Sequence, residues 1–224
     1  RFMAQAMCPP LGGKETPWGD ESLSYFENNK AGFRCLLDKH NISITTVMIF
    51  GSPTTGPYSL QYWLKHHHPT IILNTPERMR YAIDQYFSLF NQTPDVVFFH
   101  TTLWDFKMVV QDFTHFSVPA NTPGTKEFDQ AVSRYYRGHQ ECLHELYGIL
   151  KQRGIERTTR IALRTAFEIP FAKRCLKSAY PVIGAINQAV SSLAEQMQLS
   201  LYDFNYEVES EFFGHYEDCR YVLF

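Results

Sequence analysis

A serine on a sharp turn is the first group in the chain that could act as a nucleophile. The β-branched and apolar run from Ile42 to Phe50 predicts a strand buried on both faces of a parallel sheet. The run stops at Gly51-Ser52-Pro53, and apolar residues resume at helical spacing from Tyr58. α/β enzymes place nucleophiles and anion sites where a strand turns into a helix at the carboxyl edge of the sheet. Ser52 is therefore a candidate catalytic residue, and a simple connecting loop is the alternative.

The other clusters of reactive side chains argue against metal chemistry. Adjacent side chains diverge on a helix or a strand, so the contiguous His66-His67-His68 seldom close on one metal ion. The five cysteines are widely spaced and form no C-x-x-C motif, which argues against a zinc ribbon or a thioredoxin-type site. We predict neither a metal nor a cofactor.

Apolar periodicity predicts the elements that would position these groups. Further strands are expected at 70–73, 95–100, 160–165 and 199–203, and helices at 58–66, 76–90, 126–153 and 181–198. Because strands alternate with helices, the predicted fold is an α/β three-layer sandwich, in which helices flank both faces of a central, mostly parallel five-stranded sheet. Residues 1–41 are predicted to be an irregular N-terminal arm, and residues 42–224 a single domain.

Length and composition fit one globular domain and exclude two classes of partner. The chain has 224 residues, of which 44% are hydrophobic and 15% aromatic, enough for a substantial core. A net charge of −2 and the lack of a basic stripe argue against nucleic-acid binding. No stretch approaches the ~20 apolar residues that a membrane span needs. Sequons at Asn41 and Asn91 precede predicted strands and favour a secretory or Golgi compartment.

The order of these landmarks resembles the SGNH/GDSL hydrolase superfamily, and within it the PC-esterase-like branch. Ile49 to Gly56 (IFGSPTTG) is similar to the nucleophile turn F-G-D-S-L-T-x-G. Pro94 to Asp105 (PDVVFFHTTLWD) resembles the PDVVxxNSxLWD segment of that branch. The strand at 160–165, with Pro170 behind it, is similar to the strand that ends in W-R-T-x-P. Residues 186–203 are similar to the helix and strand that precede the catalytic end of these proteins.

The resemblance implies an acyl-transfer site with a serine nucleophile. In the family, a histidine from a C-terminal D-x-x-H motif takes the serine proton, and a backbone N–H, a glycine and an asparagine donate to the oxyanion. Aligning Gly51 with the family glycine places Ser52 on the aspartate and Pro53 on the nucleophile. Proline has no nucleophilic atom. A shift of one residue restores Ser52 as the nucleophile but removes the aspartate.

The remaining blocks also depart from the family pattern. Thr102 takes the place of a glycine and Trp104 that of the oxyanion asparagine, while Asp105 matches. Asn74 is the polar residue nearest the position of the second-block glycine. In the last block, Asp218 to Tyr221 (DCRY) has the D-x-x-H spacing with tyrosine in place of histidine; alternatively, the motif lies beyond the last residue of the chain.

These departures leave three hypotheses. The first is a catalytically degenerate SGNH-like protein that serves as a structural or binding subunit, with a protein partner or a glycan ligand. The second is an active esterase or acyltransferase on an O-acylated glycan or lipid, in which Ser52 attacks, a histidine supplied from elsewhere acts as base, and Asp105 or Asp218 orients it. The third is a carbohydrate binder, in which Trp63, Trp104 and Tyr221 stack on sugars. The candidates for substrate binding are Gly51, Asn74, Thr102, Trp104 and Tyr221.

Overall fold

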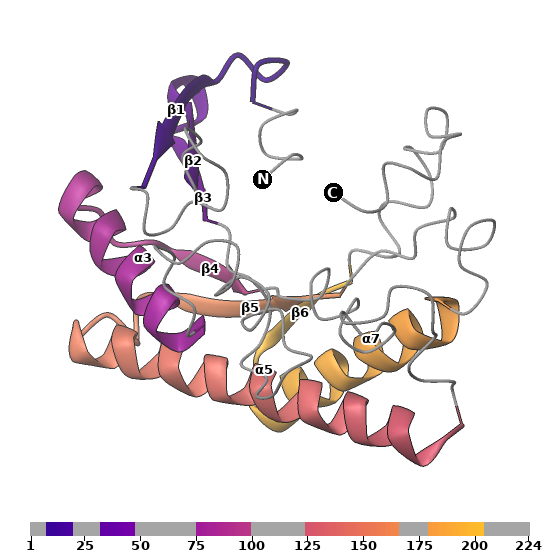
Figure 1. Ribbon diagram of the computed structural model, residues 1–224. Helices are drawn as coiled ribbons and strands as arrows, with labels where there is room; N and C mark the ends of the chain where they lie inside the picture. Colours follow the sequence, from indigo (N-terminus) through magenta and orange to yellow (C-terminus); the bar gives the residue numbers. More distant parts are fainter. Residues whose placement is uncertain (1–7, 20–31, 48–74, 100–123, 166–178, 204–224) are drawn as a thin grey trace, which may run out of the picture. The chain divides into compact units, whose positions relative to one another are not determined.

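The computed structural model describes residues 8–19, 32–47, 75–99, 124–165 and 179–203. These residues form a mixed α/β structure with three α-helices, a three-stranded antiparallel sheet and a three-stranded parallel sheet (Figure 1). The chain divides into two compact units. The first comprises Arg1–Phe50 and Gln61–Thr93, and the second Gly51–Leu60 and Pro94–Phe224.

The first unit contains the antiparallel sheet, in the order β1-β2-β3. Along β2, apolar residues alternate with polar or half-buried ones, as expected for a strand with one buried face. Phe33, Cys35 and Leu37 are buried together with Cys8, and a disulfide joins Cys8 to Cys35. The strands are β1 (Lys14–Trp18), β2 (Gly32–Leu37) and β3 (Ile42–Val47), with the 3-10 helix η1 (Asp38–His40) before β3.

Helix α3 (Thr75–Phe90) packs against the other face of this sheet. The rings of Trp18 and Phe90 meet edge-on with their centroids 5.8 Å apart. Trp18 pairs with Gly32, where a Cβ atom would lie 2.2 Å from the indole. The missing side chain therefore lets the indole cross β2, and its N–H donates to the Thr46 carbonyl of β3 at 3.1 Å.

Two predictions for this unit are wrong. Ile42–Phe50 was expected to be a buried strand of a parallel sheet, but β3 pairs antiparallel with β2 and its residues are exposed or half-buried. Residues 1–41 were expected to be irregular, but they contain β1 and β2. In β3 the alternation of Ile42 and Ile44 with polar neighbours fits an antiparallel strand with two different faces.

The second unit contains the parallel sheet, in the order β4-β5-β6. The strands are β4 (Val96–Phe99), β5 (Arg160–Arg164) and β6 (Ser200–Tyr202), with α5 (Lys126–Gln152) and α7 (Ala179–Gln196) between them in the chain. Both helices lie on the same face of the sheet (Figure 1). Right-handed crossovers produce this arrangement when successive strands add to a sheet in one direction.

The predicted helices at 76–90, 126–153 and 181–198 and the last three predicted strands are confirmed, with small shifts at their ends. Local signals fix the ends of α5. The Thr125 hydroxyl accepts a hydrogen bond from the Phe128 N–H at 3.3 Å, which caps the first turn. At the other end Gly154 has a φ of 68°, and the Ile155 N–H donates to the Leu150 carbonyl. Leu143, Leu146 and Leu150 of α5, and Ile183, Ile186, Val190 and Leu193 of α7, form the buried stripes that helical periodicity predicts.

The prediction of one five-stranded sheet is wrong. The described parallel sheet has three strands, the first predicted strand belongs to the other sheet, and the strand predicted at 70–73 lies outside the described residues. The described helices of this unit cover one face of its sheet rather than both. None of the helices in the described part of the chain is long and apolar enough to cross a membrane.

Candidate functional site

The carboxyl edge of the parallel sheet is the candidate functional site, because open α/β sheets bind ligands there. Three of the stretches singled out in the sequence meet at this edge on adjacent strands. Residues 96–99 lie on β4, residues 160–164 on β5 and residues 200–202 on β6. Residues that are more than 60 positions apart in sequence therefore end side by side.

A side-chain hydrogen bond joins β5 and β6 at this edge. The hydroxyl of the buried Thr165 donates to Oδ1 of Asp203 at 2.9 Å, and the Thr165 N–H donates to the Tyr202 carbonyl at 3.2 Å. Together these bonds orient a carboxylate just beyond the end of β6. Asp203 itself is exposed at this edge of the sheet.

Two aromatic rings and an arginine lie on the sheet face opposite the described helices of this unit. Phe98 is 61% exposed and Tyr202 40%, and their ring centroids lie 6.3 Å apart in an edge-on arrangement. Between them lies Ala162 of β5, whose small side chain leaves room for both rings. Arg164 is in register with Tyr202. Burial lowers the pKa of Arg164 and Tyr202 acts in the opposite direction, but an arginine keeps its charge.

On the other face, α5 brings a buried histidine against β4. The His139 ring lies 4.9 Å from that of Phe99 and 5.5 Å from that of Tyr135, between centroids, and His139 is 1% exposed. Burial disfavours the imidazolium and lowers the pKa of His139 to about 3. A group with that pKa is a weak proton acceptor, so His139 does not suit the role of a general base at neutral pH.

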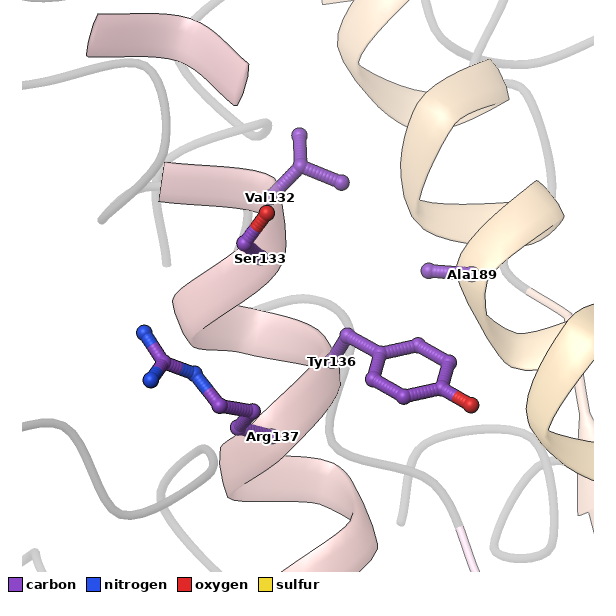
Figure 2. A pocket seen from close by; sticks show the side chains of 5 residues that line it. All are labelled: Val132, Ser133, Tyr136, Arg137 and Ala189. Atoms are coloured by element: carbon purple, nitrogen blue, oxygen red, sulfur yellow. The ribbon is translucent and has the colours of Figure 1, made fainter. Parts of the chain in front are cut away.

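A shallow groove of about 300 Å³ runs between α5 and α7 (Figure 2). Its lining is Val132, Ser133, Tyr136, Arg137 and Ala189. The Tyr136 ring points toward α7, where its hydroxyl donates to the Gln196 side chain, while Arg137 points away from α7. The groove therefore offers few polar groups that could recognise a ligand.

All the site residues predicted from the sequence lie outside the described residues. They are Gly51, Ser52, Asn74, Thr102, Trp104, Asp105, Asp218 and Tyr221. The sequence also marked the stretches that hold Thr165 and Asp203, but it did not predict the bond between them. The signal was present, because each is the last residue of a strand that the sequence predicts for the parallel sheet.

Within the described residues, no group of three or more histidine, cysteine, aspartate or glutamate side chains is placed to hold a metal ion. No protein-family model, no curated protein and no solved structure matches the chain.

Proposed function

We propose that the chain is a catalytically degenerate relative of the SGNH/GDSL esterases that acts as a structural or binding subunit. The observation that carries this proposal is the order β4-β5-β6 with both helices on one face. This is the arrangement of strands 3-4-5 in a doubly wound sheet of order 2-1-3-4-5. It also brings three of the four stretches that resemble the family to one edge.

The chemistry of the chain supports the loss of catalysis. Pro53 takes the place of the nucleophile in the register that aligns Gly51, and Tyr221 takes the place of the catalytic histidine in the register that aligns Asp218. An active site would then need a histidine from elsewhere. His139 packs against β4, but its pKa of about 3 makes it a poor base. Loss of one member of a catalytic triad already removes most of the rate.

The test is labelling with a fluorophosphonate, together with release of p-nitrophenol from p-nitrophenyl acetate. Wild type and Ser52→Ala should give the same low labelling and the same background rate of hydrolysis. A Thr165→Val variant, which removes the hydroxyl that holds Asp203, should also leave both readings unchanged. Stoichiometric labelling of wild type at Ser52, absent in Ser52→Ala, would overturn the proposal and favour an esterase or acyltransferase.

A glycan ligand is the second candidate, and the exposed pair of Phe98 and Tyr202 favours it. Exposed aromatic rings combine a large apolar face with a rigid shape, which suits contact with the face of a sugar ring. Retention on immobilised O-acetylated polysaccharide should weaken about tenfold in Phe98→Ala if the ring contributes about 1.4 kcal/mol. Tyr147→Ala, at an exposed aromatic residue of α5, is the matched control and should bind like wild type.

Equal retention of wild type and Phe98→Ala would remove the glycan candidate but would leave a protein partner open. A pull-down that compares wild type with Phe98→Asp then tests for a protein partner. A carboxylate on this face would weaken an apolar contact with such a partner, so the variant should retain less of it.

A further inference from the structure

Both sequons of the chain lie on exposed turns of the first unit. Asn41 follows η1 and Asn91 follows α3, and both asparagines are exposed. Their backbones are left-handed, with φ values of 52° and 45°. Neither exposed carboxamide forms a hydrogen bond with another described residue.

Helix capping explains part of this pattern. Asparagine is common in the left-handed position after a helix, and the Asn91 N–H donates to the Phe87 carbonyl as such a cap requires. Capping does not require a hydroxyl residue two positions later. Ser43 and Thr93 supply that hydroxyl at both turns, and the pattern N-x-S/T occurs nowhere else in the chain.

The two sequons also approach the same side chain. The guanidinium of Arg34, on β2, donates from Nε to the Ser43 hydroxyl at 3.0 Å and from Nη2 to Oε1 of the Gln92 side chain at 2.6 Å. Ser43 is the third residue of one sequon and Gln92 the second residue of the other. One arginine therefore spans both sites, and they lie on the same side of the first unit.

The disulfide of the same unit is an independent indication of the compartment. Cys8 and Cys35 are both buried at 1% exposure and bonded to each other. Disulfides form and persist in the lumen of the endoplasmic reticulum and outside the cell, and they are rare in the cytosol. N-linked oligosaccharides are added in that same lumen.

We propose that Asn41 and Asn91 carry N-linked oligosaccharides, which form a pair of glycans on either side of Arg34. Each Nδ2 forms a bond to the anomeric carbon of the first sugar of a polyprenyl-pyrophosphate-linked oligosaccharide. The bond between that carbon and the pyrophosphate oxygen breaks, the polyprenyl pyrophosphate leaves, and the amide gives up one proton. This inference does not depend on whether the second unit is an esterase.

The test follows the full chain directed into the secretory pathway of cultured eukaryotic cells. Wild type should migrate more slowly than Asn41→Gln or Asn91→Gln, and each of these more slowly than the double variant. Peptide N-glycosidase should bring all of them to the mobility of the double variant and convert each occupied asparagine to aspartate. The sugar is added to the nascent chain, so a variant that folds poorly still reports occupancy.

Variants at the hydroxyl position separate modification from capping. Ser43→Ala keeps the carboxamide of Asn41 and should lose one glycan, whereas Ser43→Thr keeps the sequon and should retain both. If wild type migrates like the double variant both before and after treatment with peptide N-glycosidase, the proposal is overturned. Occupancy of one asparagine alone would overturn it for the other.

Discussion

Replacing His139 should make the protein less sensitive to acid. Burial lowers the pKa of His139 to about 3, whereas an unfolded histidine titrates near ~6.5. Between these values only the unfolded state binds the proton. The stability that the neutral imidazole contributes is therefore complete above about 6.5 and is lost progressively as the pH falls toward about 3.

The magnitude at about pH 5 follows from the unfolded state alone. A pKa about 1.5 units above the pH stabilises the unfolded state by roughly 2 kcal/mol, at about 1.36 kcal/mol for each unit. The value hardly changes as long as the folded pKa stays below about 4, because the folded state then binds almost no proton at about pH 5. At about pH 7 the same contribution is only ~0.2 kcal/mol.

Urea unfolding followed by circular dichroism measures this contribution for wild type and His139→Gln. The difference in unfolding free energy between the two should move by about 2 kcal/mol in favour of the variant from about pH 7 to about pH 5. His144→Gln, at an exposed histidine of the same helix, is the control and should keep the wild-type acid sensitivity. If wild type and His139→Gln lose the same free energy of unfolding between about pH 7 and about pH 5, the reasoning is refuted, because His139 would then be protonated in the folded protein as well.

Three further substitutions probe the packing, the disulfide and a helix end. Leu163→Ala, at a fully buried residue of β5, should lower the free energy of unfolding by about 2–5 kcal/mol, measured in urea. Cys35→Ser breaks the bond to Cys8 across a sequence separation of 27 and should cost about 3.5 kcal/mol, measured in the same way. Gln198→Gly should stabilise by about 1 kcal/mol, seen as a higher Tm, because Gln198 has a φ of 53°.

Each substitution has a matched comparison. Leu201→Ala, at a 40% exposed residue of β6, should cost less than Leu163→Ala, and equal costs would contradict the burial of the latter. A reducing agent should destabilise wild type to the level of Cys35→Ser and should leave that variant unchanged. Gly154→Ala places a side chain where φ is 68° after α5 and should lower the Tm, opposite in sign to Gln198→Gly. A lower Tm for Gln198→Gly would refute the account of that helix end.

The helices were predictable because their signals are local. The buried stripe of α5 repeats every three to four residues, and its ends carry Thr125 before the first turn and Gly154 after the last. Strand partners were less predictable. A short apolar run fits a parallel or an antiparallel sheet equally well, and the partner of β3 is β2, which lies in the stretch predicted to be irregular. The alternation of Phe33, Cys35 and Leu37 was the signal that could have revealed β2.

The site is harder to predict than the fold because its residues meet only through long-range pairing. Thr165 and Asp203 are 38 positions apart, and only the register of β5 with β6 brings their side chains to 2.9 Å. The exposure of Phe98 has the same origin. β4 is apolar throughout, which predicts burial on both faces. Because the strands add to the sheet in one direction, however, the described helices of this unit lie on the face opposite Phe98.

At the carboxyl edge, groups that stabilise the sheet can be distinguished from groups that would take part in catalysis. The bond from Thr165 to Asp203 ties two strands together, and it contributes about 1 kcal/mol whether or not a nucleophile stands nearby. On the proposed scaffold, this pair would therefore stabilise the sheet even if the serine site had lost its base. On that scaffold Ser52 and Pro53, by contrast, would affect turnover and not the pairing of β5 with β6. An intact pairing of β5 with β6, together with a degenerate nucleophile motif in the sequence, is thus the pattern that the proposed binding or structural subunit should show.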